Sequence, residues 1–388
     1  MTRTLRLALL LAIPAAAAML YFRSPWPLLL LGVAGLCVVS AMALRSDAAK
    51  VAMANLAALC VALAAFEGYL EYKASTGDGT RMEGTIVNDF VERDDLLGYR
   101  PKMGSRVTAR KLHADTVIYD VVYSINADGL RVMPTSGPHP ARHCAVFFGD
   151  SITFGEGVGD EDAYPYQVVA GSGGAVAGFN FAFSGYGPHQ MLGAVQAGAV
   201  ERIATCRPSH FVHLAILEHI ARVAGLAAWD RHGPRFMLDA RGRPVRDGNF
   251  DAPADPRWPK VPGWLADSAD RYRTWQKFFG RGRALRAADL DLYLAVVRET
   301  ASLLRERHPG SRFDVLLWDG RDDDRLAVIE RSLNSAGINV HRLTAIIDDF
   351  NSAAARYLLG PQDGHPNALM HRHIADYVLA SVVPRPGP

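Results

Sequence analysis

Two short stretches of the sequence carry residue types that perform nucleophilic catalysis. In the first, an apolar run ends at Phe148 and leads into a Gly-Asp-Ser turn whose serine is Ser151; in the second, Asp363 stands two residues before His365. A serine becomes a nucleophile when a histidine accepts its proton and a carboxylate orients that histidine. Gly, Asp and Ser are also ordinary turn formers, so the first stretch alone is equally typical of a simple turn. The second stretch favours a relay of Ser151, His365 and Asp363.

The elements around these two stretches predict an α/β fold. From about residue 145 onward, short apolar runs alternate with helical periodicity, which is typical of a parallel sheet with helices on both faces. Such sheets bind ligands at the carboxyl ends of their strands, so Ser151 is expected at that edge. Asn367 is a suitable N-cap for the last helix. Strands are expected near residues 145–148, 179–183, 211–217, 313–318 and 338–343, and an amphipathic helix through residues 290–304.

These stretches and a third one resemble the SGNH (GDSL-like) hydrolase superfamily over roughly residues 140–385. The resemblance rests on Gly-Asp-Ser-Ile-Thr-Phe-Gly at 149–155, Asn-Phe-Ala-Phe-Ser-Gly-Tyr-Gly at 180–187 and Asp-Gly-His-Pro-Asn at 363–367. It implies an SGNH, flavodoxin-like fold and a catalytic triad of Ser151, His365 and Asp363. It also implies an oxyanion hole that includes the backbone N–H groups of Ser151 and Gly185.

One stretch departs from the family's pattern. The family usually has Gly-x-Asn-Asp after its third strand, whereas this chain has Leu-Glu-His-Ile at 217–220. A carboxylate cannot donate a hydrogen bond, so His219 is the expected substitute for the missing asparagine in the oxyanion hole. The residues expected to line the substrate pocket are Asp150, Tyr186 and Glu218.

The composition limits the partners and the chemistry. A formal net charge of +2 favours neither a nucleic-acid binder nor an acidic tail, so no nucleic-acid partner is expected. No His, Cys and carboxylate cluster has zinc spacing and no glycine-rich phosphate loop is present, so no metal and no cofactor are expected. Cys144 and Cys206 flank neighbouring predicted strands. Outside the cytoplasm they can form a disulfide, and two separate buried thiols are an equally good alternative.

Residues 1–72 are predicted to be a membrane region with about three transmembrane helices. Apolar runs at 5–22, 26–44 and about 51–70 approach the roughly 20 residues that span a bilayer, the third being the weakest because it contains Asn55 and Glu67. A cleaved signal peptide is the rival interpretation of the first run. With three spans, the basic residues at 3, 6, 45 and 50 share one side, which predicts a cytoplasmic amino terminus. The rest of the chain then lies outside the inner membrane, in the periplasm of a Gram-negative bacterium.

The remainder divides into a β-rich lead-in at 80–140 and a hydrolase-like domain at 141–388 with an insertion at 226–286. The lead-in is expected to be a strand pair that covers the edge of the sheet. The insertion contains a predicted hairpin at 236–245 and follows the third strand, at the edge of the sheet where functional loops cluster. Its tryptophans either stack on sugar rings or pack the insertion itself. They are Trp229, Trp258, Trp264 and Trp275.

Together these features predict a membrane-anchored serine ester hydrolase or O-acyltransferase that acts on acyl groups, with acetyl expected, of an extracytoplasmic glycan. Hydrolysis and transfer share one acyl-enzyme, so the sequence does not separate them. The alternative is a catalytically weak glycan-binding or assembly protein that retains the fold, which the departed stretch and the Trp-rich insertion favour. Similar lead-ins occur in membrane-anchored family members of exopolysaccharide clusters, so the analogy also suggests exopolysaccharide-machinery proteins as partners.

Overall fold

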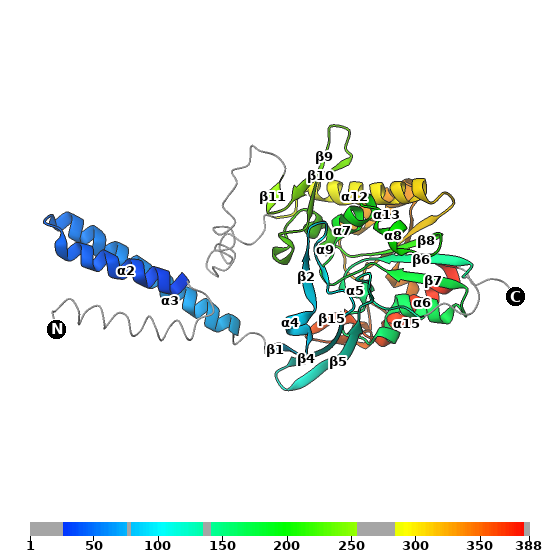
Figure 1. Ribbon diagram of the computed structural model, residues 1–388, viewed down its shortest axis with the longest axis horizontal. Coiled ribbons are helices and arrows are strands. Elements are labelled where there is room, and N and C mark those ends of the chain that lie inside the picture. The colour runs from blue at the N-terminus through cyan, green and yellow to red at the C-terminus, as the bar shows by residue number, and fades with distance from the viewer. Residues whose placement is uncertain (1–25, 76–78, 135–140, 254–283, 384–388) are drawn as a thin grey trace. The chain divides into compact units, whose positions relative to one another are not determined.

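The computed structural model describes residues 26–75, 79–134, 141–253 and 284–383 (Figure 1). These residues belong to two compact units, a pair of helices and the part of the chain from Thr80 onward. The helical pair consists of α2 (Trp26–Ala43) and α3 (Asp47–Ser75). The first of the three predicted membrane runs, at 5–22, lies outside the described residues.

Helix α3 is longer than the apolar run that predicts it. The helix continues beyond the run at 51–70, to Asp47 on one side and to Ser75 on the other, and has 29 residues. Among the described residues, Asp47–Leu70 is long and apolar enough to cross a membrane by length and composition, and Leu30–Ala43 is a shorter apolar helix. The structure is therefore compatible with a membrane anchor. Small buried side chains join the two helices, namely Ala34, Cys37, Ala57 and Cys60.

The centre of the second unit is a five-stranded sheet in which all neighbouring strands are parallel. Its order is β13-β12-β8-β6-β7, so the first of these strands in the chain, β6, lies between the second and the third. This is the doubly wound order 2-1-3-4-5, whose switch point lies between β6 and β8. The prediction of an α/β fold with a parallel sheet is confirmed. The strands are β6 (His143–Phe148), β7 (Val176–Asn180), β8 (His210–Ala215), β12 (Arg312–Leu317) and β13 (Asn339–Arg342).

Helices cover both faces of this sheet (Figure 1). Phe148 belongs to the core formed with α7, α9, α12 and α13, and Phe147 to the core formed with α6, α14 and α15. Successive side chains of a strand point to opposite faces, which explains why these neighbours enter different cores. On the first face lie α7 (Pro188–Gln196), α8 (Ala199–Ile203), α9 (Glu218–Val223), α12 (Ala287–Arg307) and α13 (Asp324–Ser335). On the second lie α6 (Tyr164–Gly171), α14 (Leu343–Ile346) and α15 (Ala368–Tyr377) with its extension η4 (Val378–Val382).

One strand differs from its predicted position. The sequence places a strand at 179–183, but β7 ends at Asn180. The side chain of Asn180 accepts a hydrogen bond from the N–H of Ala182 at 3.1 Å and donates one to the carbonyl of Thr153 at 3.0 Å. An asparagine that bonds two residues ahead forms a turn, so the chain leaves the sheet here. The aromatic residues that follow are thereby free to pack against the lead-in.

The lead-in packs on the loops that follow β6 and β7. Phe90 and Tyr123 share a core with Phe154, which ends the short helix after β6. Among the described residues, pairing between the lead-in and the parallel sheet is limited to one bridge, from Arg131 to Asn180. The sequence predicts that the lead-in covers the edge of the sheet, but in the structure it mainly covers the loops after β6 and β7. Its apolar side chains pack against the aromatic residues of these loops. Its elements are β1 (Thr80–Glu83), α4 (Ile86–Asp89), β2 (Val91–Asp94), β3 (Gly98–Pro101), β4 (Arg106–His113) and β5 (Thr116–Ser124).

The described part of the insertion contains the predicted hairpin. Strands β9 and β10 pair antiparallel, and the carboxylate of Asp239 closes the turn by accepting the N–H groups of Arg241 and Arg243. Trp258, Trp264 and Trp275 lie outside the described residues. The elements are η2 (Ala228–Asp230), β9 (Pro234–Leu238), β10 (Pro244–Asn249) and β11 (Ala252–Pro253). The short elements elsewhere are α5 (Ser151–Phe154), η1 (Asp160–Asp162), η3 (Ala354–Arg356), β14 (Leu358–Gly360) and β15 (Asp363–Pro366).

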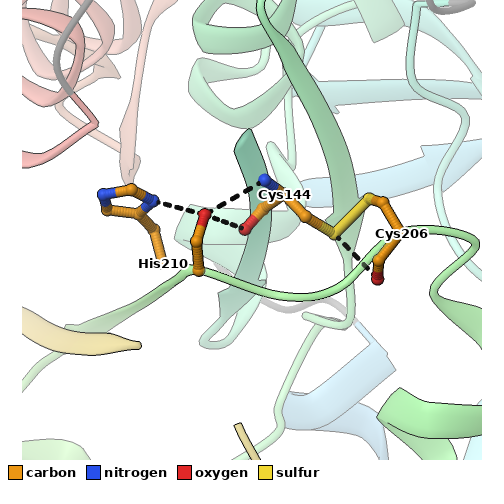
Figure 2. Close-up of a disulfide and its surroundings, with 4 residues drawn as sticks. Cys144, Cys206 and His210 are labelled. Carbon is orange, nitrogen blue, oxygen red and sulfur yellow. Dashed lines mark hydrogen bonds between the residues drawn. A yellow bond between two sulfur atoms is a disulfide. The ribbon is translucent and has the colours of Figure 1, made fainter. Parts of the chain in front are cut away.

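Cys144 and Cys206 form a disulfide (Figure 2). Of the two alternatives that the sequence leaves open, the structure contains the bonded pair. Ser209 adds a second connection, because its hydroxyl hydrogen-bonds the backbone of Cys144 and Nδ1 of His210. The disulfide thus ties β6 to the segment that leads into β8, the two strands on either side of the switch point.

Candidate active site

Ser151 begins the helix α5 directly after the central strand β6. Asp150 caps this helix, since its carboxylate accepts the N–H of Ile152 at 3.0 Å. Gly149 joins strand to helix with a φ of 156°, and a Cβ at this position would collide with the side chain of Thr153. The first N–H groups of a helix have no intrahelical acceptor, so the N–H of Ser151 can donate to a ligand.

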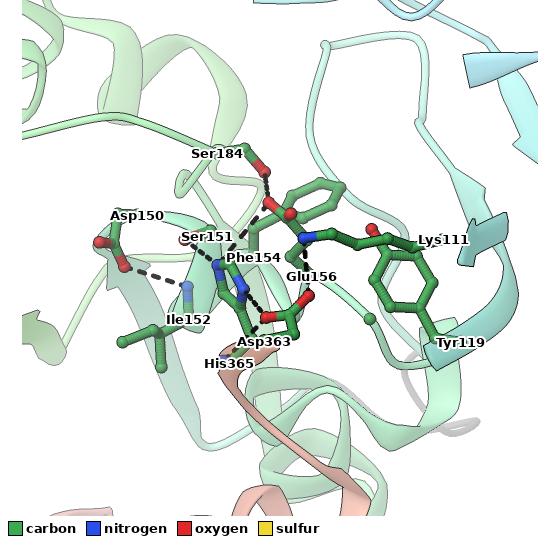
Figure 3. A network of polar contacts seen from close by, with 12 residues as sticks. Lys111, Tyr119, Asp150, Ser151, Ile152, Phe154, Glu156, Ser184, Asp363 and His365 are labelled. Carbon is green, nitrogen blue, oxygen red and sulfur yellow. Dashed lines mark hydrogen bonds and ion pairs between the residues drawn. The ribbon is translucent and has the colours of Figure 1, made fainter. Parts of the chain in front are cut away.

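His365 links Ser151 to Asp363 through its two ring nitrogens (Figure 3). Its Nε2 lies 2.8 Å from Oγ of Ser151, and its Nδ1 lies 2.6 Å from Oδ1 of Asp363. The backbone N–H of His365 donates to the same carboxylate oxygen at 3.0 Å, which holds the two residues in one tight loop. The structure therefore brings together the three residues that the sequence groups, in a geometry where an imidazole can accept a serine proton.

Lys111 holds the second oxygen of Asp363 and was not singled out by the sequence. Its Nζ donates to Oδ2 at 2.8 Å, and the carboxyl side chain is only 1% exposed. Burial alone would raise the pKa of Asp363, but the bonds from His365 and Lys111 outweigh it and hold that pKa well below its usual range. Lys111 lies on β4 of the lead-in, so the lead-in completes the environment of the relay.

Glu156 is a second carboxylate beside His365. Its Oε2 lies 3.9 Å from Nε2 of the histidine and accepts a hydrogen bond from Oγ of Ser184 at 2.7 Å (Figure 3). Burial opposes the charged imidazole, but the bond to Asp363 and the charge of Glu156 outweigh it, so the pKa of His365 lies above its ordinary value of 6.5. The protonated form of His365 is therefore stabilised by two carboxylates.

Arg131, also from the lead-in region, fixes the loop that carries this glutamate. Its guanidinium is fully buried and donates to the carbonyls of Phe154 and Gly155 at 2.5 and 2.6 Å. It also donates to the carbonyl of Val158 at 2.7 Å and pairs with Asp160 at 2.9 Å. A buried arginine whose guanidinium nitrogens all donate hydrogen bonds makes the surrounding backbone rigid. Arg131 therefore holds the loop that carries Glu156 in place.

Asp150 is fully buried and forms an ion pair with Arg222. Nη1 of Arg222 lies 2.8 Å from Oδ2 of the carboxylate and 2.6 Å from the carbonyl oxygen of Tyr186. Burial alone would raise the pKa of Asp150, but His219 and Arg222 outweigh it and keep that pKa well below its usual range. The charged carboxylate therefore orders the turn that presents Ser151.

His219 does not face the space beside Ser151, in contrast to the expectation for an oxyanion donor. Its side chain is fully buried, with Nε2 3.4 Å from Oδ2 of Asp150 and its ring stacked on that of His213. Burial is the main cause that lowers the pKa of His219, so the ring is neutral at ordinary pH. The residue one turn later on α9, Arg222, forms part of the cavity wall instead. The structure thus does not support His219 in the oxyanion hole, and Arg222 is the buried side-chain donor of α9 that lines the cavity.

Gly185 retains a free donor. Its carbonyl accepts the indole N–H of Trp229 at 3.3 Å, while its own N–H bonds to no other described residue. With a φ of 82°, it lies so close to Tyr99 and Trp229 that a Cβ would collide with both. The N–H of Gly185 is therefore without an acceptor among the described residues, which an oxyanion donor requires. Trp229, which is 60% exposed, is the one tryptophan of the insertion that the described residues place at the site.

A cavity of about 340 Å³ opens beside Ser151 and His365. Asp150 and Glu218 are among its lining residues, as the sequence suggests, and Glu218 also pairs with Arg321 at 2.9 Å. Tyr186 does not line this cavity. Its ring is buried in the core with Phe183, and its hydroxyl donates to the carbonyl of Tyr99 at 2.7 Å. The remaining charged and amide-bearing lining residues are Arg222, Arg321, Gln362 and Asp363.

The described residues contain no group of three or more His, Cys, Asp or Glu side chains that is arranged to hold a metal ion. The chemistry available from the side chains in place is proton transfer between Ser151 and His365, with Asp363 as the orienting carboxylate.

No protein-family model matches the chain, and no curated protein is similar to it. Several solved structures are. One is LAE5, an α/β hydrolase enzyme from the metagenome of Lake Arreo, with 14% identity over 62% of this chain and 95% of that chain and a TM-score of 0.34. Another is Axe2, an acetylxylan esterase from Geobacillus stearothermophilus, with 13% identity over 62% and 94% of the two chains and a TM-score of 0.36. A third is a family two carbohydrate esterase from Clostridium thermocellum in complex with cellohexaose, with 11% identity over 64% and 66% and a TM-score of 0.34. Values this low assign neither a family nor a substrate.

Proposed function

We propose that the chain is a membrane-anchored serine ester hydrolase or O-acyltransferase of the SGNH type. The observation that carries the proposal is the relay from Ser151 through His365 to Asp363 at the switch point of a parallel sheet. Nucleophile and base at hydrogen-bond distance, with the base oriented by a third group, are the signature of activated serine catalysis. The switch point is also where open α/β sheets bind their ligands.

The proposed reaction has two steps. Oγ of Ser151 attacks the ester carbonyl while Nε2 of His365 takes its proton, and the imidazolium then protonates the departing alcohol. In the second step, the oxygen of water or of an acceptor hydroxyl attacks the acyl carbon and gives its proton to His365. The bond from the acyl carbon to Oγ then breaks, and His365 returns the proton to Oγ of Ser151. The backbone N–H groups of Ser151 and Gly185 would hold the oxyanion in both steps, and Arg222 would add positive charge nearby.

The proposed substrate is an O-acylated glycan outside the cytoplasm. The cavity beside Ser151 has several polar lining residues, and the exposed Trp229 offers an aromatic face next to Gly185. The disulfide between Cys144 and Cys206 supports an oxidising compartment, and α3 supports an inner-membrane anchor. Acetyl is the acyl group expected from the sequence. Partners in exopolysaccharide assembly remain a proposal by family analogy.

A catalytically weak glycan-binding or assembly protein is the second candidate. It is favoured by one observation, that the usual asparagine donor is replaced by His219, which faces Asp150 and not the cavity. In that case Trp229 and the polar cavity would bind a sugar without turnover.

An ester assay with an acceptor separates these possibilities. The full chain is incubated with p-nitrophenyl acetate, with and without an oligosaccharide, and compared with Ser151→Ala. We expect nitrophenol release that requires Ser151; release without an acylated sugar identifies a hydrolase, and formation of the acylated sugar identifies a transferase. A folded protein that releases no more nitrophenol than Ser151→Ala would favour the binding protein.

A further inference from the structure

A second cavity, larger than the one beside Ser151, is built mainly by the lead-in. Its volume is about 570 Å³, compared with about 340 Å³ for the first. Its lining is dominated by apolar and aromatic side chains, and Val87 and Val91 at its wall are more than half exposed. An open apolar cavity of this size is typical of a site for an organic ligand. The other apolar lining residues from the lead-in include Met82, Ile86, Phe90 and Tyr119.

Two charged lining residues of this second cavity contact the relay. Glu156 and Lys111 both belong to its lining. Glu156 lies 3.9 Å from Nε2 of His365, and Lys111 donates to Asp363 at 2.8 Å. An apolar group inside the cavity would therefore lie beside residues that contact His365 and Asp363.

The candidate oxyanion donor also lies beside this cavity. Tyr99 and Trp229 line the second cavity, and they are also the side chains that crowd the Cα of Gly185. Ser151 and His365, in turn, line the first cavity. The candidate nucleophile thus lines the polar cavity, and the side chains that crowd the candidate oxyanion donor line the apolar one.

We propose that the apolar cavity binds the acyl chain of the ester, and that this chain is a hydrocarbon of medium length and not acetyl. The inference rests on the proposed function. Oγ of Ser151 forms a bond to the acyl carbon, the bond from that carbon to the alcohol oxygen breaks, and His365 passes the serine proton to this oxygen. The alcohol, a sugar hydroxyl, leaves through the polar cavity, and water or a second hydroxyl later releases the acyl chain.

The size of the cavity gives the expected preference. An acetyl group would leave nearly all of it unfilled, whereas each methylene that becomes buried strengthens binding by roughly fourfold. An octanoyl group adds six methylenes to acetyl. We therefore expect the ratio of kcat/KM for p-nitrophenyl octanoate to that for p-nitrophenyl acetate to be at least about ten, even if part of the chain stays exposed.

The test uses the full chain in lipid nanodiscs and two tryptophan substitutions. Val87→Trp fills the wall of the apolar cavity, and Val117→Trp is the matched control, because Val117 is an exposed lead-in valine that does not line the cavity. We expect Val87→Trp to lower the octanoate-to-acetate ratio at least tenfold and Val117→Trp to preserve it. Partition of the longer ester into lipid is the same for both variants. A wild-type ratio of one or below, or equal ratios in the two variants, would overturn the inference and leave the proposed function standing.

Absence of turnover on both esters would instead count against the proposed function. Binding then decides the inference on its own. Calorimetric titration of octanoate and acetate into Ser151→Ala, alone and combined with each tryptophan substitution, requires no catalysis. The cavity remains the proposed acyl-chain site if octanoate binds at least tenfold more tightly than acetate. Val87→Trp should then abolish this tighter binding, and Val117→Trp should preserve it. Equal binding of both carboxylates refutes it.

Discussion

Lys111 on β4 of the lead-in donates a hydrogen bond to Asp363, 252 positions later in the chain. The bond occupies the oxygen of Asp363 that His365 leaves free, so both oxygens of a nearly inaccessible carboxylate have partners. The lead-in is therefore part of the site and not a separate appendage. This relationship makes the contribution of the lead-in measurable.

Lys111→Met should weaken both the fold and the activity. Removing the ammonium leaves a buried carboxylate oxygen without its partner, which costs about 1–3 kcal/mol of unfolding free energy. If Asp363 loses its orientation, kcat should fall roughly tenfold, the equivalent of 1.36 kcal/mol at the transition state. Lys102→Met, which removes an exposed lead-in lysine paired with Asp89, is the control and should leave kcat unchanged. Equal effects of the two substitutions in denaturation and ester assays would contradict this role.

Glu156→Gln should shift the pH profile of kcat/KM towards acid. The carboxylate stabilises the protonated form of His365, whose pKa lies above its ordinary value, and the protonated form cannot act as a base. Removing the charge lowers this pKa, so the acid limb should move to lower pH while Gln still accepts the bond from Ser184. Glu161→Gln, at an exposed position on η1, changes the net charge equally and should not move the limb. A shift to higher pH would be incompatible with the proposed role of Glu156.

Arg222→Met should be strongly destabilising because it leaves Asp150 charged and buried without its guanidinium partner. The expected loss of unfolding free energy is about 3–5 kcal/mol. Adding Asp150→Asn should recover much of this loss, since Asn retains an acceptor for the N–H of Ile152 without the charge. Additive losses in the double variant, measured by denaturant unfolding, would show that the two residues do not act as a pair.

Removal of the disulfide should lower stability without changing the chemistry. The bridge closes a sequence separation of 62 residues, for which loop entropy predicts a contribution of about 4 kcal/mol. Cys144→Ser/Cys206→Ser and reduction by dithiothreitol should therefore lower the melting temperature alike. No change in either experiment would mean that the two cysteines are not bonded in the isolated protein.

The sequence predicts the parallel sheet and the last helix because these depend on local patterns. It predicts the convergence of Ser151, His365 and Asp363 because these residue types stand in two motifs that resemble those of a known family. Apolar runs define strands, and nucleophile, base and acid stand directly beside them. The contacts of Lys111 with Asp363 and of Glu156 with His365 belong to no such motif, so these two roles are established only by the structure.

The placement of His219 also shows that a sequence motif does not determine which side chain faces the cavity. His219 matches the family's donor position in the sequence, but the residue of this helix that lines the cavity is Arg222, one helical turn later. The end of β7 was missed for a comparable reason. Apolar residues continue to Phe183, but the hydrogen bonds of Asn180 stop the strand.

The most direct test of the account is covalent labelling of the full chain by a fluorophosphonate probe at neutral pH. Such probes react with a serine that a neighbouring histidine activates. The account predicts labelling of the wild type, no labelling of Ser151→Ala, and strongly slowed labelling of His365→Ala, with all three proteins folded. A folded wild type that resists the probe, or a Ser151→Ala variant that is labelled as fast as the wild type, would contradict it.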